Sequence, residues 1–149
     1  MIEKPKTIKI YTVITLGYLG LLPPLIAVST SLANYISLQE SFHFCLLYAN
    51  IILSFLGGTH WFAGISSDSD APMRKILSGI FSSLLGLISL VIRGSGGAIL
   101  TISGLLVLAG IEKTFPILPQ EEFEWYLSLR VNLTVGLISL LVVSLCLSS

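Results

Sequence analysis

The stretch SFHFCLLYANIILSFLGGTHWFAGISS, residues 41–67, contains no Asp, Glu, Lys or Arg. A helix crosses the hydrocarbon core of a bilayer, which is about 30 Å thick, with about 20 apolar residues. Residues 41–67 therefore predict a membrane-spanning helix. Four further runs also lack formal charges: 10–39, 76–92, 94–111 and 131–149. All sixteen charged residues of the chain lie before the first run or between the five runs.

These five runs predict an all-α membrane protein in which residues 1–149 form a single bundle of five transmembrane helices. The composition agrees, because 54% of the residues are hydrophobic, 11% are charged and the mean hydropathy is +0.92. The net charge is zero and there is no basic run, which argues against a nucleic-acid partner and leaves the lipid bilayer as the expected one. The expected spans are about 10–32, 41–64, 74–92, 96–112 and 128–147.

The basic residues predict the orientation of the bundle. In a chain of five spans, one side receives seven of the eight basic residues: Lys4, Lys6, Lys9, Arg74, Lys75, Lys113 and Arg130. The other side receives only Arg93. Because basic residues concentrate in cytoplasmic connections, we expect a cytoplasmic N-terminus and a periplasmic C-terminus.

The expected location is the plasma (inner) membrane of a bacterium. The N-terminal segment lacks the arginine and the amphipathic serine-rich pattern of a mitochondrial presequence. A cleavable signal peptide is the alternative for the first run. That run is too long for a signal peptide and continues with apolar residues after Pro23 and Pro24, so we favour a retained span.

Local motifs predict where several helices begin or turn. Ser37 and Glu40 have the spacing of a capping box at the start of the second span. Asp70 and Pro72 have the pattern of an N-cap followed by proline in the first helical turn. The sequence RGSGG, residues 93–97, predicts a tight turn between the third and fourth spans, because glycine accepts positive φ.

Two further patterns concern helix surfaces. Residues 120–130 have apolar spacing of three and four, which predicts either an interfacial helix or the first turns of the last span. Small and polar residues predict close helix contacts, since they let backbones approach. They lie in the second, third and fifth spans: Ser54, Gly58, Gly79, Ser82, Ser83, Gly86, Asn132, Gly136 and Ser139.

No catalytic, cofactor or metal site is predicted. His43 and His60 are 17 residues apart, roughly 25 Å along a helix, so they cannot share a metal. The sequence has no Gly-x-Ser-x-Gly elbow and no phosphate-binding loop with Lys followed by Ser or Thr. A disulfide between Cys45 and Cys146 is possible in a periplasm, but two separate buried thiols are favoured.

Three blocks of sequence stand out along the chain: LGYLGLLP (16–23), LSFLGGTHW (53–61) and WYLSLR (125–130) with Leu133 and Thr134. They resemble the motifs of the membrane family called domain of unknown function 3429, the transmembrane protein 69-like group. The departures are Phe62, where glycine is expected, and Pro24, where an aromatic residue is more common. The resemblance implies an inner-membrane protein of about five helices and carries no activity.

The predicted topology brings these blocks to the cytoplasmic half of the bilayer. One interpretation is an aromatic belt in which Arg130 reaches out to headgroups, which is favoured because interfacial Trp and Tyr need no ligand. The other is a ligand or partner site in which two glycines leave space, two tryptophans form walls, and a histidine and an arginine bind an anionic or polar head. Its candidate residues are Gly57, Gly58, His60, Trp61, Trp125, Tyr126 and Arg130.

Three functions are compatible with the sequence. The favoured hypothesis is a non-enzymatic accessory or assembly subunit of a membrane protein complex, because the chain has little outside the lipid and no recognisable chemistry. The second is a binder of a lipid, quinone, porphyrin or other hydrophobic small molecule. The third, a small transporter, is disfavoured because no acidic residue lies inside any predicted span.

Overall fold

The computed structural model describes residues 4–66, 71–118 and 120–149, and their regular structure is all helical. Five segments are long and apolar enough to cross a membrane, as predicted, and the first of them is built from two consecutive helices. The helices are α1 (Lys4–Leu19), α2 (Leu22–Leu32), α3 (Leu38–Ile65), α4 (Pro72–Ile92), α5 (Gly94–Thr114) and α6 (Gln120–Ser148).

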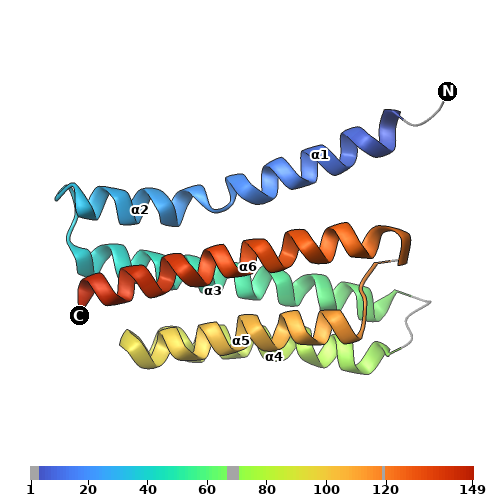
Figure 1. Cartoon of the computed structure of the whole chain (residues 1–149). Helices are drawn as coiled ribbons and strands as arrows, with labels where there is room; N and C mark the ends of the chain where they lie inside the picture. Colours follow the sequence, from blue (N-terminus) through green and yellow to red (C-terminus); the bar gives the residue numbers. More distant parts are fainter. Residues whose placement is uncertain (1–3, 67–70, 119) are drawn as a thin grey trace.

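The five spans alternate in direction, so the connections between them gather at two opposite ends of the bundle (Figure 1). At one end, α1 begins, α3 ends near the start of α4, and α5 ends near the start of α6. We call it the basic end, because the segments that meet there carry seven of the eight basic residues. The α2–α3 connection, the α4–α5 turn and the C-terminus lie at the opposite end.

Several helix boundaries follow the predicted signals. The side chain of Ser37 accepts a hydrogen bond from the Glu40 N–H at 3.1 Å, and the Glu40 carboxylate accepts one from the Ser37 N–H at 2.9 Å, which confirms the capping box. Pro72 is the first residue of α4, whereas Asp70 lies outside the described residues. Residues 120–130 are the first turns of α6 and not a separate interfacial helix, because α6 is continuous from Gln120.

The first span is interrupted at Gly20 and Leu21. Pro24 has no N–H, so it cannot bond to the Gly20 carbonyl four residues earlier, and the proline ring crowds that carbonyl. The freed oxygen accepts a hydrogen bond from the hydroxyl of Tyr48 in α3 instead. The interruption is therefore satisfied within the bundle, as a backbone group in a lipid environment requires.

The turn between α4 and α5 is shorter than predicted. Arg93 and Gly94 have positive φ values of 59° and 54°, and α5 begins at Gly94. The prediction of a turn over residues 93–97 is thus wrong, because the remaining glycines are helical. Gly97 packs so close to α4 that a Cβ there would overlap the Ser89 carbonyl oxygen.

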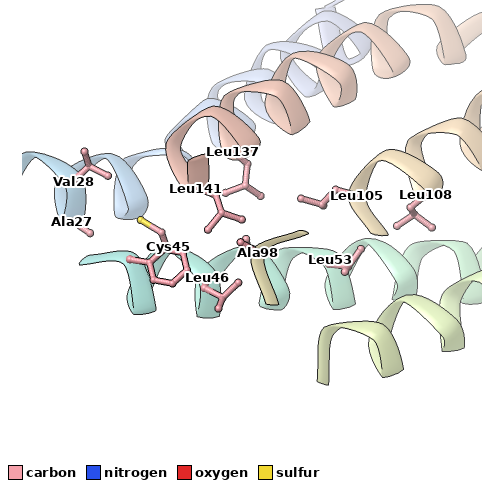
Figure 2. Close-up of a cluster of buried hydrophobic side chains, with 12 residues drawn as sticks. Ala27, Val28, Cys45, Leu46, Leu53, Ala98, Leu105, Leu108, Leu137 and Leu141 are labelled. Carbon is pink, nitrogen blue, oxygen red and sulfur yellow. The ribbon is translucent and has the colours of Figure 1, made fainter. Parts of the chain in front are cut away.

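The apolar core joins α2, α3, α5 and α6 (Figure 2). Ala49 and Leu53 of α3 are completely buried, with leucines from the other helices around them. Cys45 belongs to this core, whereas Cys146 is exposed, and both are free thiols. The expected separation of the thiols is confirmed, although the expected burial of Cys146 is wrong.

A closed polar network lies inside the bundle. The hydroxyls of Ser89 and Thr101 are 2.7 Å apart, and Thr101 also donates to Asn50 Oδ1 at 3.1 Å. Asn50 Nδ2 donates to Ser89 Oγ at 3.2 Å and to the Leu46 carbonyl at 2.9 Å. The network links α3, α4 and α5 through mutually satisfied groups, so it has a structural role.

The closest helix contact is between α3 and α4. A Cβ at Gly57 would lie 2.7 Å from the Gly79 carbonyl oxygen and would overlap Ser82 Oγ. Farther along, Gly86 faces Asn50 and Ser54. The small residues of the third span thus let the backbones approach, as predicted. Gly136 instead packs on Leu21, and the other small residues predicted at contacts are exposed: Gly58, Ser83, Asn132 and Ser139.

Adjacent glycines in α3 test this contact. Gly57→Leu should destabilise the protein by at least about 2 kcal/mol, because the added side chain must displace α4. Gly58→Leu is the matched control, since a Cβ at Gly58 meets nothing within 4 Å of the described chain. Both substitutions gain the same helix propensity. Unfolding in mixed micelles, followed by circular dichroism, measures the difference; equal stability of the two variants would contradict the packing.

Candidate ligand-binding site

A buried ion pair connects α5 to α6 near the basic end. Arg130 donates from Nε and Nη2 to Glu112 Oε2, at 2.8 and 2.7 Å. Glu112 is completely buried and Arg130 is only 8% exposed. Arg130 therefore faces the bundle, which contradicts the interpretation that it reaches outward to headgroups.

Glu112 also corrects the prediction that no acidic residue lies inside a span. It is the last residue of the predicted span 96–112 and follows the charge-free run 94–111 directly, and α5 continues past it to Thr114. An acidic residue can stay in the helix because Arg130 compensates its charge and supplies hydrogen bonds. The partner lies 18 positions later in the sequence, so no local pattern indicated the pair.

Further polar groups surround the ion pair. His60 of α3 is completely buried, and its Nδ1 lies 3.3 Å from Ser78 Oγ of α4. Lys75 is also buried and donates from Nζ to the Pro116 carbonyl at 2.9 Å.

Three buried atoms in this region lack a hydrogen-bond partner among the described residues. They are His60 Nε2, Glu112 Oε1 and Arg130 Nη1, from three different helices. Buried polar groups in native proteins are nearly always hydrogen-bonded. The region therefore has unused capacity to bind a small polar group. No group of three or more described His, Cys, Asp or Glu residues could hold a metal.

A groove of about 270 Å³ opens beside Arg130, between the first span, α3 and α6. Three polar residues, Arg130, Tyr126 and Thr59, are among its lining residues, and the Arg130 guanidinium carbon lies 6.0 Å from the centre of the Tyr126 ring. Most of the remaining lining is apolar. It comprises Val13, Leu16, Gly17, Gly20, Leu21, Tyr48, Ile52, Phe55, Leu56, Leu105, Leu129, Leu133, Thr134 and Leu137.

The structure separates the seven predicted site residues. Tyr126 and Arg130 line the groove, and His60 lies buried behind it in the bundle. Gly57 leaves no space, because α4 packs directly on it, and Gly58 faces outward. Trp61 is 46% exposed, and Trp125 packs edge-on against Tyr126 with 6.1 Å between ring centres. The two tryptophans are not among the groove-lining residues, so they do not form the walls of this groove.

Sequence reasoning missed the residues that form the opposite wall. Gly17 and Gly20 belong to the first motif block, LGYLGLLP, and they line the groove from the first span. A Cβ at Gly17 would lie 3.0 Å from Leu133 of α6, so glycine permits the close crossing of the first and last spans. The predicted topology could have indicated these residues, because it put the block at the same depth in the bilayer as Tyr126 and Arg130.

Comparison with known families covers both the groove and the ion pair. The family model described as protein of unknown function (DUF3429) matches residues 10–146. The chain belongs to the DUF3429 family. The resemblance of the three sequence blocks is thereby confirmed. By helix length and composition, this DUF3429 protein is a multi-pass membrane protein. No curated protein and no solved structure shows a significant match to it.

The ion pair makes a testable energetic prediction for this DUF3429 protein. Glu112→Leu and Arg130→Leu should each destabilise the fold by about 3–5 kcal/mol, because each leaves one buried charge unpaired. The double variant should lose far less than the sum, since neither charge remains. Chemical unfolding of the four proteins in micelles gives the coupling energy. Additive losses would show that the two side chains do not depend on each other.

Proposed function

We propose that this DUF3429 protein is a non-enzymatic membrane protein that binds a single-chain amphiphilic small molecule. The groove between the first span, α3 and α6 carries the proposal, because its walls are mostly apolar and its lining includes the polar residues Arg130, Tyr126 and Thr59. Small-molecule sites typically have this character, in which a few polar groups orient a mostly apolar ligand.

The size and position of the groove support a slender ligand. Its volume of about 270 Å³ is near the lower limit for small-molecule sites, about 300–1,000 Å³. A lipid with two acyl chains and a large headgroup would exceed it. The first span diverges from the other helices toward the basic end, where α1 begins (Figure 1). A ligand could therefore enter sideways from the bilayer, between α1 and α6.

The groove changes our preference among the three functions that the sequence left open. An accessory or assembly subunit would need only an outer surface that fits its partner, and the groove adds nothing to that role. For a transporter, Glu112 does put an acidic residue within a span, but Arg130 compensates it and the carboxylate does not line the groove. Ligand binding uses both the groove and the Glu112–Arg130 ion pair beside it, so we favour this function.

The orientation belongs to the same proposal. We expect the basic end to face the cytoplasm of a bacterium, because seven of the eight basic residues belong to that end. The polar part of the groove then lies toward the inner leaflet. A reporter enzyme that is active only in the periplasm should work when fused after Ser149 and fail when fused after Lys113. The reverse result would overturn the orientation.

Photolabelling tests ligand binding directly. The probe is dodecanol that carries a diazirine in its chain, added to the purified full chain in lipid nanodiscs. We expect labelled peptides from the groove walls, and Val13→Trp should reduce this labelling at least about tenfold by filling the groove. Val135→Trp is the matched control, because Val135 is exposed on α6 and does not line the groove. Equal labelling of both variants contradicts the proposal.

A further inference from the structure

We infer that the head group bound beside Arg130 is an uncharged hydroxyl, as in an alcohol or phenol, and that Glu112 sets this preference. The inference rests on the ligand-binding function proposed above and specifies its chemistry. It narrows the alternative drawn from sequence, in which His60 and Arg130 bind an anionic or polar head, to an uncharged polar head. The evidence is the way in which the ion pair uses its hydrogen-bonding groups.

One carboxylate oxygen takes both bonds of the ion pair. Arg130 Nε and Nη2 donate to Glu112 Oε2, which leaves Oε1 as a free acceptor. Arg130 Nη1 remains a free donor. Both free atoms are buried without a partner among the described residues, and they belong to two side chains already held together. Both atoms therefore belong to one ion pair, and the inferred head group bonds to the two of them.

The charge of Arg130 is not available to an anion. Glu112 compensates it at 2.7 Å, and the completely buried carboxylate has little water to screen it. A carboxylate, sulfonate or phosphate head bonded to Nη1 would lie beside Glu112 and be repelled by it. Lys75 adds a positive charge to the region, but it donates to the Pro116 carbonyl and does not line the groove. The site therefore disfavours anionic heads.

A hydroxyl satisfies both free atoms at once. Its oxygen accepts from Arg130 Nη1 and its hydrogen is donated to Glu112 Oε1, whereas a carbonyl head can satisfy only the donor. Tyr126 lines the groove and its ring faces the guanidinium at 6.0 Å. Because Glu112 does not line the groove, the inference requires the head group to displace the Tyr126 ring in order to reach the ion pair. A site whose buried polar groups match one head group strongly rejects an analogue that leaves them unpaired.

Two probes of equal chain length test the head-group preference. They are diazirine-bearing dodecanol and the corresponding dodecyl sulfonate, which stays ionised at any working pH. In nanodiscs, the wild-type protein should be labelled in the groove at least about tenfold more by the alcohol than by the sulfonate. Glu112→Gln keeps the size of the side chain and removes its charge, so labelling by the sulfonate should rise about tenfold relative to the alcohol.

The outcomes separate this inference from the function on which it rests. If neither probe labels the groove, the ligand-binding proposal fails and the head-group preference fails with it. If the sulfonate labels the wild-type groove as strongly as the alcohol, and Val13→Trp blocks both, ligand binding stands and the hydroxyl preference is overturned. The wild-type comparison needs no variant, so the test holds even where Glu112→Gln does not fold.

Discussion

The ion pair between Arg130 and Glu112 fixes α5 against α6 in a part of the bundle where neither charge could remain alone. A buried pair of this kind adds little net stability compared with apolar residues, but the loss of one partner is costly. Its effect is therefore to specify which helix faces meet. Arg130 turns inward, and Tyr126, one turn earlier on α6, therefore faces the groove. The rotation of α6 that forms the ion pair thus also decides which α6 residues line the groove.

Backbone and side-chain polar groups elsewhere follow the same rule of internal satisfaction. The Gly20 carbonyl, deprived of its helical partner by Pro24, bonds to Tyr48, and the Asn50, Ser89 and Thr101 side chains satisfy one another. Each solution joins elements that are distant in sequence. Four buried side-chain atoms of the described residues have no partner. One is Ser41 Oγ near the start of α3, and the other three belong to His60, Glu112 and Arg130 toward the basic end, where Arg130 lines the groove. That contrast is the reason to connect the polar cluster with a ligand.

Charge-free runs predicted the five spans because the hydrocarbon core imposes its length on any helix that crosses it. The capping box was equally predictable, since Ser37 and Glu40 interact within one turn. The site was predicted only in part. Tyr126 and Arg130 line the groove as expected from their depth, but Gly57 is filled by α4 and the tryptophans lie elsewhere. The rotation of each helix and the pairing of Arg130 with Glu112 are decided by contacts between helices, and neither hydropathy nor local spacing encodes them.

The crossing of the first span with α6 has a consequence for how the protein is made. Gly20 and Leu133, on opposite walls of the groove, are 113 positions apart, so the first wall enters the membrane long before the second is synthesised. During that interval Gly17 has no α6 to pack against, and Glu112 precedes its arginine out of the ribosome. Domains usually form from the N-terminus as synthesis proceeds. Here α6, which follows the other described helices in the sequence, completes the structure, so a chain that stops before α6 has four spans and a Glu112 carboxylate without its arginine.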